Sequence, residues 1–118
     1  MADQVKVIEA QMFKLVDMQG NPRAVLTFGQ TADPVLEFYD KGGNVRASLS
    51  FTEYGEPAFE LNNAAGNARF TVGISPGEQP HLTLSNNDQP ALLMWIDDDG
   101  TPSAAGIGPN GETVWTAP

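Results

Sequence analysis

Residues 34–51 read PVLEFYDKGGNVRASLSF, and this stretch decides the fold. Apolar residues take alternate positions on both sides of the central DKGG: Leu36 and Phe38 come before it, and Leu49 and Phe51 come after it. A period of two is typical of a β-strand with one buried face. The Asp-x-x-Gly between the two runs suits a tight turn, because aspartate accepts backbone hydrogen bonds and glycine adopts positive φ. The stretch therefore predicts a β-hairpin.

The hairpin recurs along the chain with a period of 23 residues. Each unit carries a turn aspartate or asparagine, a turn glycine, an arginine three residues after that glycine, and an opening proline. The recurring residues are Asp17, Asp40, Asn63 and Asn86; Gly20, Gly43 and Gly66; Arg23, Arg46 and Arg69; and Pro34, Pro57 and Pro80. The fourth unit departs from this pattern, since Gln89 stands for the glycine and Leu92 for the arginine. Such self-similarity indicates one supersecondary unit copied several times.

The remaining segments extend the same pattern. A degraded fifth unit runs from Pro102 to Trp115, and residues 5–10 form a first half-unit. No window shows the 3.6-residue period of a helix. Polar turns are expected between the hairpins at residues 29–33, 52–56, 75–79 and 97–101. The chain is thus predicted to be one all-β domain, residues 1–118, with about ten short strands in an antiparallel meander.

The alternation places the large apolar side chains on one face of this sheet. In the fourth unit it assigns Leu93 and Trp95 to the same face as Leu82 and Leu84. A sheet does not leave such a face in water. We expect the sheet to close into an up-and-down barrel; the alternatives are that it folds over as a sandwich or is completed by oligomerisation.

The other face of the sheet has an order of its own. Arg23, Arg46 and Arg69 recur at one position of the units, and Glu37 and Glu60 recur on the partner strands. We expect cross-strand Arg–Glu ion pairs, each stabilising by up to about 1 kcal/mol.

Charge and composition exclude several classes of function. The chain has 118 residues, a net charge of −9 and no cysteine, and its six Lys and Arg residues lie within the first 69 positions. Such a surface repels phosphate backbones and anionic lipids, so we expect neither nucleic-acid nor membrane binding. The sequence shows no signal peptide and no apolar run long enough to span a membrane, and we expect a cytoplasmic protein.

Three motifs associated with chemistry are better explained by structure. GIGPNG, residues 106–111, matches the G-x-G-x-x-G of dinucleotide sites, but a strand-like TVW follows it instead of a helix. Asp97–Asp99 are consecutive, whereas calcium loops alternate their ligands. His81 is the only histidine, and zinc sites need several His or Cys ligands. The sequence therefore predicts no catalytic residue, no cofactor and no metal site.

Two segments resemble a known group of proteins. FYDKGGNVRASL (38–49) and VWTAP (114–118) are similar to bacterial hypothetical proteins built from repeated L-x-D-x-x-G-x-x-R-A-x-L hairpins that end in a Trp-x-x-Pro tail. The resemblance covers roughly residues 13–118. It implies a hairpin-repeat fold, and it brings no known activity.

Because no catalytic constellation is found, we expect a non-enzymatic structural or interaction module that assembles with itself as a homo-oligomer or binds a protein partner. The alternative is a small barrel that binds a small apolar ligand in its interior. The residues expected to face a partner or ligand are Phe38, Phe51, Phe59, Phe70, Trp95 and Trp115. Trp95 is expected in the core, and Trp115 is expected either to close the seam of the barrel or to anchor a neighbouring chain.

Overall fold

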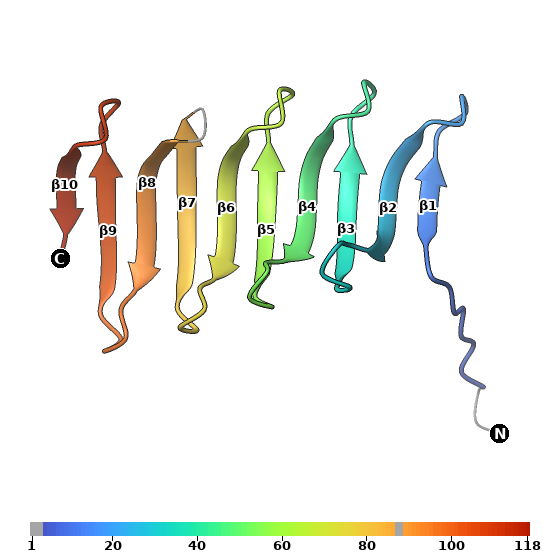
Figure 1. Cartoon of the computed structure of the whole chain (residues 1–118), viewed down its shortest axis with the longest axis horizontal. Helices are drawn as coiled ribbons and strands as arrows, with labels where there is room; N and C mark the ends of the chain where they lie inside the picture. The colour runs from blue at the N-terminus through green and yellow to red at the C-terminus, as the bar shows by residue number, and fades with distance from the viewer. Residues whose placement is uncertain (1–3, 87–88) are drawn as a thin grey trace.

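The computed structural model describes residues 4–86 and 89–118, and these residues form a single antiparallel sheet without helix. The turn of the fourth unit falls partly on residues 87–88, and the signal-peptide prediction falls partly on residues 1–3; both stretches lie outside the described residues. The strands are β1 (Phe13–Val16), β2 (Pro22–Phe28), β3 (Pro34–Tyr39), β4 (Val45–Phe51), β5 (Pro57–Asn62), β6 (Ala68–Ile74), β7 (Pro80–Asn86), β8 (Gln89–Ile96), β9 (Pro102–Ile107) and β10 (Thr113–Ala117). Each strand pairs with the next one along the chain, so the predicted ten-stranded meander is confirmed (Figure 1).

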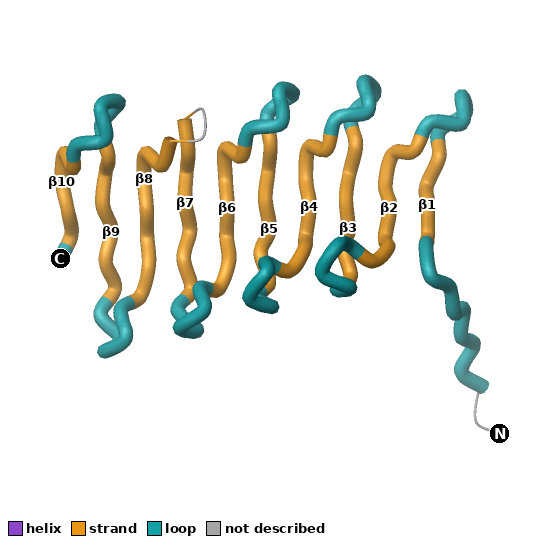
Figure 2. The backbone as a smooth tube through the Cα atoms, viewed as in Figure 1, coloured by secondary structure: helices purple, strands orange, loops and turns teal. Residues whose placement is uncertain are grey.

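The turns at both ends of the strands share one geometry (Figure 2). In each described five-residue turn the first N–H donates to the fifth carbonyl, and the fourth N–H donates to the first carbonyl. This pattern holds at 29–33, 52–56, 75–79 and 97–101, where the turns were predicted. The fourth residue has positive φ throughout; it is glycine at six turns, but Ala32 and Glu78 take that place with φ of 63° and 70°.

The repeating Asp or Asn residues stabilise the turns at one end of the sheet. Asp40 Oδ1 accepts from the N–H groups of Gly42 and Asn44 at 2.9 and 3.0 Å. Asn63 Oδ1 makes the equivalent two bonds, at 3.1 and 3.0 Å. Because both residue types present an acceptor oxygen here, the exchange of Asp for Asn is neutral for the turn.

The strand register arranges one face of the sheet, the apolar face, into three rows that cross the strands at right angles. The first row is Leu15, Ala24, Phe38, Ala47, Leu61, Phe70, Leu84, Leu92, Gly106 and Trp115. The second row is Phe13, Leu26, Leu36, Leu49, Phe59, Val72, Leu82, Met94, Ala104 and Ala117. The third row spans β2 to β9 and consists of the pairs Phe28–Pro34, Phe51–Pro57, Ile74–Pro80 and Ile96–Pro102. No member of these rows is polar or charged.

The prediction that Leu93 and Trp95 share this face is wrong. Leu82 pairs with Met94, whereas Trp95 pairs with His81 on the opposite, polar face. The cause is the length of one turn: residues 63–67 separate the paired Asn62 and Ala68, but only residues 86–89 separate Ser85 and Pro90. Because one residue is missing from this turn, every following side chain of β8 lies on the face opposite to the one that the 23-residue repeat predicts. Ala91, not Leu92, therefore takes the place of the repeating arginine.

The sheet is open, so the predicted barrel finds no support. β1 and β10 are its two edges, and the longest dimension of the molecule is 56 Å. Figure 1 shows the strands running nearly parallel to one another across the whole sheet. A barrel requires strands that tilt and coil with a staggered register, whereas here the rows cross the sheet without stagger.

The predicted Arg–Glu ladder is also wrong. The Nε groups of Arg23, Arg46 and Arg69 donate to main-chain carbonyls on the next strand, at 3.1, 2.8 and 2.7 Å. The acceptors are Tyr39, Asn62 and Ser85, which lie at the register shifts of their hairpins. Among the described residues the one ion pair joins Arg46 to Asp40 at 3.5 Å. Each guanidinium thus takes the place of a main-chain hydrogen bond between strands, at the point where adjacent hairpins begin to separate.

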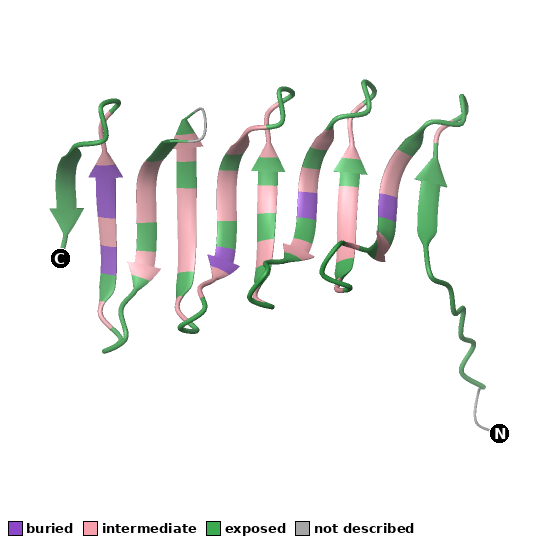
Figure 3. Ribbon diagram, in the orientation of Figure 1, coloured by how far each residue is buried: buried purple, intermediate pink, exposed green. Residues whose placement is uncertain are grey.

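The sheet has little interior, because a single layer covers neither face (Figure 3). Val25 and Ala105 are the buried apolar side chains in the described part of the chain, at 8% and 7% exposure. Both lie near the middle of the polar face, where Val25 pairs with Glu37 and Ala105 pairs with Leu93. Residues 4–12, which include the predicted half-unit, form no strand.

Candidate functional site

The apolar face is the largest chemically uniform surface of the molecule. The side chains of its rows that are large and at least 37% exposed are Phe13, Leu15, Leu26, Phe28, Phe38, Leu49, Phe51, Phe59, Leu61, Val72, Leu84, Met94, Ile96 and Trp115. Because a large apolar side chain offers roughly 150–250 Å², half exposure of this set leaves on the order of 1,000 Å² of apolar surface. The largest apolar patch on a monomeric protein is typically about 300–600 Å². This face therefore has the chemistry of a surface that is normally covered.

The structure places five of the six predicted contact residues on this face. Phe38 and Trp115 are each 47% exposed, Phe51 and Phe59 are each 37% exposed, and Phe70 is half-buried. They belong to all three rows and to five different strands, so they share a surface without forming a pocket. Trp95 is separated from them because it lies on the polar face.

The indole of Trp115 can lie against the sheet because the residue paired with it has no side chain. Gly106 is its partner in the ladder, and a Cβ atom built at Gly106 would lie 2.7 Å from Trp115 Cε2. The glycine therefore makes room for the indole to lie across β9. The sequence interpretation of residues 106–111 as a phosphate loop has no structural basis, because Gly106 lies in β9 and Gly108 begins a hairpin turn.

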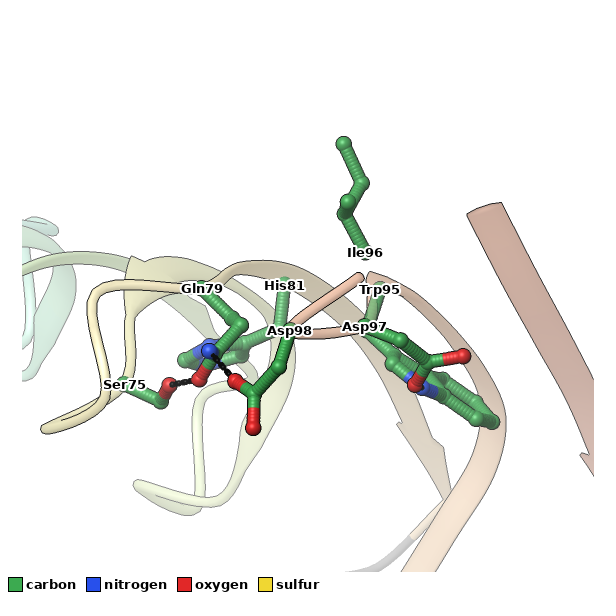
Figure 4. Close-up of a pocket in the computed structure, with 7 residues that line it drawn as sticks. All are labelled: Ser75, Gln79, His81, Trp95, Ile96, Asp97 and Asp98. Atoms are coloured by element: carbon green, nitrogen blue, oxygen red, sulfur yellow. Dashed lines mark hydrogen bonds between the residues drawn. The ribbon is translucent and has the colours of Figure 1, made fainter. Parts of the chain in front are cut away.

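A second candidate is a hollow of about 320 Å³ at one end of the polar face. Figure 4 shows that Ile96 points away from the side occupied by His81 and Trp95. His81 stands over Gly73, where an added Cβ would lie 3.3 Å from the imidazole Cε1. Trp95 Nε1 donates to Asp97 Oδ1 at 2.7 Å, which ties the indole to the turn at 97–101.

Five of the polar side chains around this hollow form hydrogen bonds within the chain: Ser75, Gln79, Trp95, Asp97 and Asp98. Asp97 Oδ2 accepts from Ser103 Oγ at 3.0 Å. Gln79 Nε2 donates to Asp98 Oδ1, and Ser75 Oγ bonds Gln79 Oε1 at 3.1 Å, so the turns at 75–79 and 97–101 are linked (Figure 4). Asp99 Oδ1 accepts from the N–H of Thr101 within its own turn. The three consecutive acids thus accept from four different residues and do not converge on one point.

The described part of the chain contains neither a metal-binding cluster nor a helix that could cross a membrane. Within 4–86 and 89–118, His, Asp and Glu side chains form no group of three that could hold a metal ion. In the same part of the chain, no helix has the length and apolar character needed to cross a membrane.

Among the residues that the structure describes, three ionisable groups have shifted pKa values, and each shift has a local structural cause. The N–H of Asn44, the largest contributor, lowers the pKa of Asp40 below 3.8. The hydroxyl of Thr101, followed by its N–H, lowers the pKa of Asp99. Burial, followed by the hydrogen bond to Glu37, raises the pKa of Tyr39 above 10.0. Two of these groups stabilise turns, and none of the three lies on the apolar face.

Comparison with known proteins adds no family to this description. No protein-family model matches the chain, and none of the curated proteins matches it.

Sequence reasoning missed several members of the apolar face. Leu92, Met94 and Ile96 of β8 were assigned to the wrong side by the strict 23-residue count. A partial signal was present, because Pro102 follows Pro80 by 22 residues; this spacing shows that one residue is missing between them, but not in which loop. The alternation of proline with Phe or Ile in the third row became visible only from the strand register.

Proposed function

We propose that this protein is a non-enzymatic structural module whose apolar face packs against the same face of a second copy. The observation that carries this proposal is the three apolar rows, which cross the sheet without one polar side chain and remain half exposed. Stable protein interfaces bury about 800 Å² per partner, and this face offers on the order of 1,000 Å². A second copy is the favoured occupant because a surface that must always be covered needs a partner in equal supply, and an isologous pair provides one.

The known packing of stacked sheets supports the same proposal. Two sheets stacked about 10 Å apart interdigitate their inner side chains and form a core that neither sheet has alone. The apolar-ligand barrel requires an enclosed interior, and no observation on the described strands favours it. The polar face supplies solvation, since Glu37, Glu60 and the three arginines lie there by alternation with the apolar rows.

Sedimentation velocity of two matched variants tests this proposal. Leu49→Asp places a charge on the apolar face at a side chain that is 48% exposed in the single chain. Ser50→Asp places the same charge one residue further along β4, on the polar face. We expect a dimeric wild type and a rise on the order of 100-fold in the dimer dissociation constant for Leu49→Asp, because the charge would be desolvated in the interface.

The control variant makes the result specific to the face. Ser50→Asp introduces the same charged residue into the same strand and should dissociate as the wild type does. A wild type that stays monomeric at every concentration, or equal weakening by the two variants, would overturn the proposal.

A further inference from the structure

The two edges of the sheet are free to pair with another chain. β1 and β10 each have one neighbour in the ladder, and every residue in them is exposed (Figure 3). Unpaired edge strands recruit other chains unless charged side chains or proline protect them. β10 contains neither, whereas β1 carries Lys14. The edge at β10 therefore lacks this protection, and the edge at β1 has a single charge.

The first and last strands also match each other in direction and level. They run in opposite directions, because they are the ends of a ten-stranded antiparallel meander. Leu15 and Trp115 are the two ends of the first row, and Phe13 and Ala117 are the two ends of the second. If β10 of one copy lay beside β1 of another with the rows in line, both rows would continue from copy to copy, and Thr116 would face Lys14 on the polar side.

Only one symmetry of a face-to-face pair produces this contact. A two-fold axis parallel to the strands turns the apolar faces toward each other and brings β10 of each copy to β1 of the other. A two-fold axis across the strands would instead place β1 against β1. With that axis at Phe13 or Leu15, an apolar residue would lie opposite Gln11 or Asp17, and with the axis at Lys14 the two Lys14 side chains would lie opposite each other. The parallel axis avoids these contacts and keeps both rows apolar.

We propose that two copies form a closed two-layer assembly in which β10 of each chain pairs antiparallel with β1 of the other. This inference rests on the proposed function, since the apolar faces must already meet, and it adds the sealing of both edges. The seal covers Leu15, which is 66% exposed in the single chain, and Trp115, which is 47% exposed. Closure through a partner also removes every unpaired edge, which one flat sheet cannot do alone.

Disulfide trapping tests the strand pairing directly, because the native chain has no cysteine. We would mix the single variants Lys14→Cys and Thr116→Cys, let the chains exchange, and oxidise them. Directly opposed residues of antiparallel strands have Cα atoms about 4.5–5.5 Å apart, which suits a disulfide. We expect a covalent heterodimer on non-reducing gels, and at least about tenfold less product when Ala117→Cys replaces Thr116→Cys, since residue 117 lies on the other face.

Each outcome decides between distinct arrangements. A wild-type dimer that gives no Lys14→Cys/Thr116→Cys product would overturn the edge pairing and leave the proposed function standing. A chain that carries both Lys14→Cys and Thr116→Cys gives a further test. A disulfide formed within that chain, with no product between mixed single variants, would mean that the sheet closes on itself. A second readout uses charge: Thr116→Lys should weaken the dimer about tenfold by facing Lys14, and adding Lys14→Glu should restore it. Failure of that rescue would count against the register.

Discussion

Among single residues, Ala32 and Glu78 hold positive φ where six other turns have glycine. A residue with a Cβ atom costs about 1–2 kcal/mol in this conformation. Glycine avoids that cost, but it loses more backbone entropy on folding, so the net gain in stability is smaller. We expect Ala32→Gly and Glu78→Gly each to raise the free energy of unfolding by about 0.5–1 kcal/mol in urea titrations. Gly55→Ala, at the equivalent position of another turn, should lower it, and a stabilising Gly55→Ala would refute this account.

Asp40 makes the stability of its turn depend on pH. Its folded pKa is lowered, so its contribution to stability is present above the unfolded value near 3.8 and is lost as pH falls through the lower folded value. Asp40→Asn should keep the turn, as Asn63 does, and remove this part of the acid dependence. Unfolding titrations from neutral to acidic pH would then show a smaller decline for Asp40→Asn than for the wild type. Parallel curves for the two proteins would exclude this role.

Between elements, the arginine bonds join one hairpin to the next. Arg46→Met removes the 2.8 Å bond from Nε to the carbonyl of Asn62 and should lower the free energy of unfolding by about 1 kcal/mol. Arg46→Lys keeps the positive charge near Asp40 but lacks the Nε donor, so it should be nearly as destabilised as Arg46→Met. If Arg46→Lys unfolded at the same temperature as the wild type, the ion pair with Asp40, and not the hydrogen bond to the carbonyl, would be the interaction that stabilises the protein.

The strands themselves show how one short turn changes a face. Leu84 pairs with Leu92, whereas the equivalent Leu61 pairs with Phe70, so the β7–β8 hairpin is one residue shorter and the apolar rows stay intact while the sequence count shifts. Trp95 consequently lies with His81 on the polar face, in register with the buried Ser103 and Gly73, and not in the apolar face. Periodicity predicted both strands correctly, but it could not say which face β8 presents, because that depends on the loop.

For the whole molecule, stability should be inseparable from association. A single layer buries few apolar side chains, so most of the apolar burial would come from the partner copy. The free energy of unfolding should therefore rise with protein concentration, by about 1.4 kcal/mol of dimer for each tenfold increase, and the urea midpoint should rise with it. Leu49→Asp should lose this dependence and unfold at a lower, constant midpoint. A wild-type midpoint independent of concentration would contradict this expectation.

The sequence by itself determined the strands and the turns, because both are local. Alternation of apolar residues sets a strand, and Asp-x-x-Gly reverses the chain within five residues. Three features were decided only by the tertiary structure: the side of Trp95, the carbonyl partners of the arginines, and the open edges at β1 and β10. Each depends on how one strand is placed against another, and that placement is set by loop length, register and coiling, which local patterns do not encode.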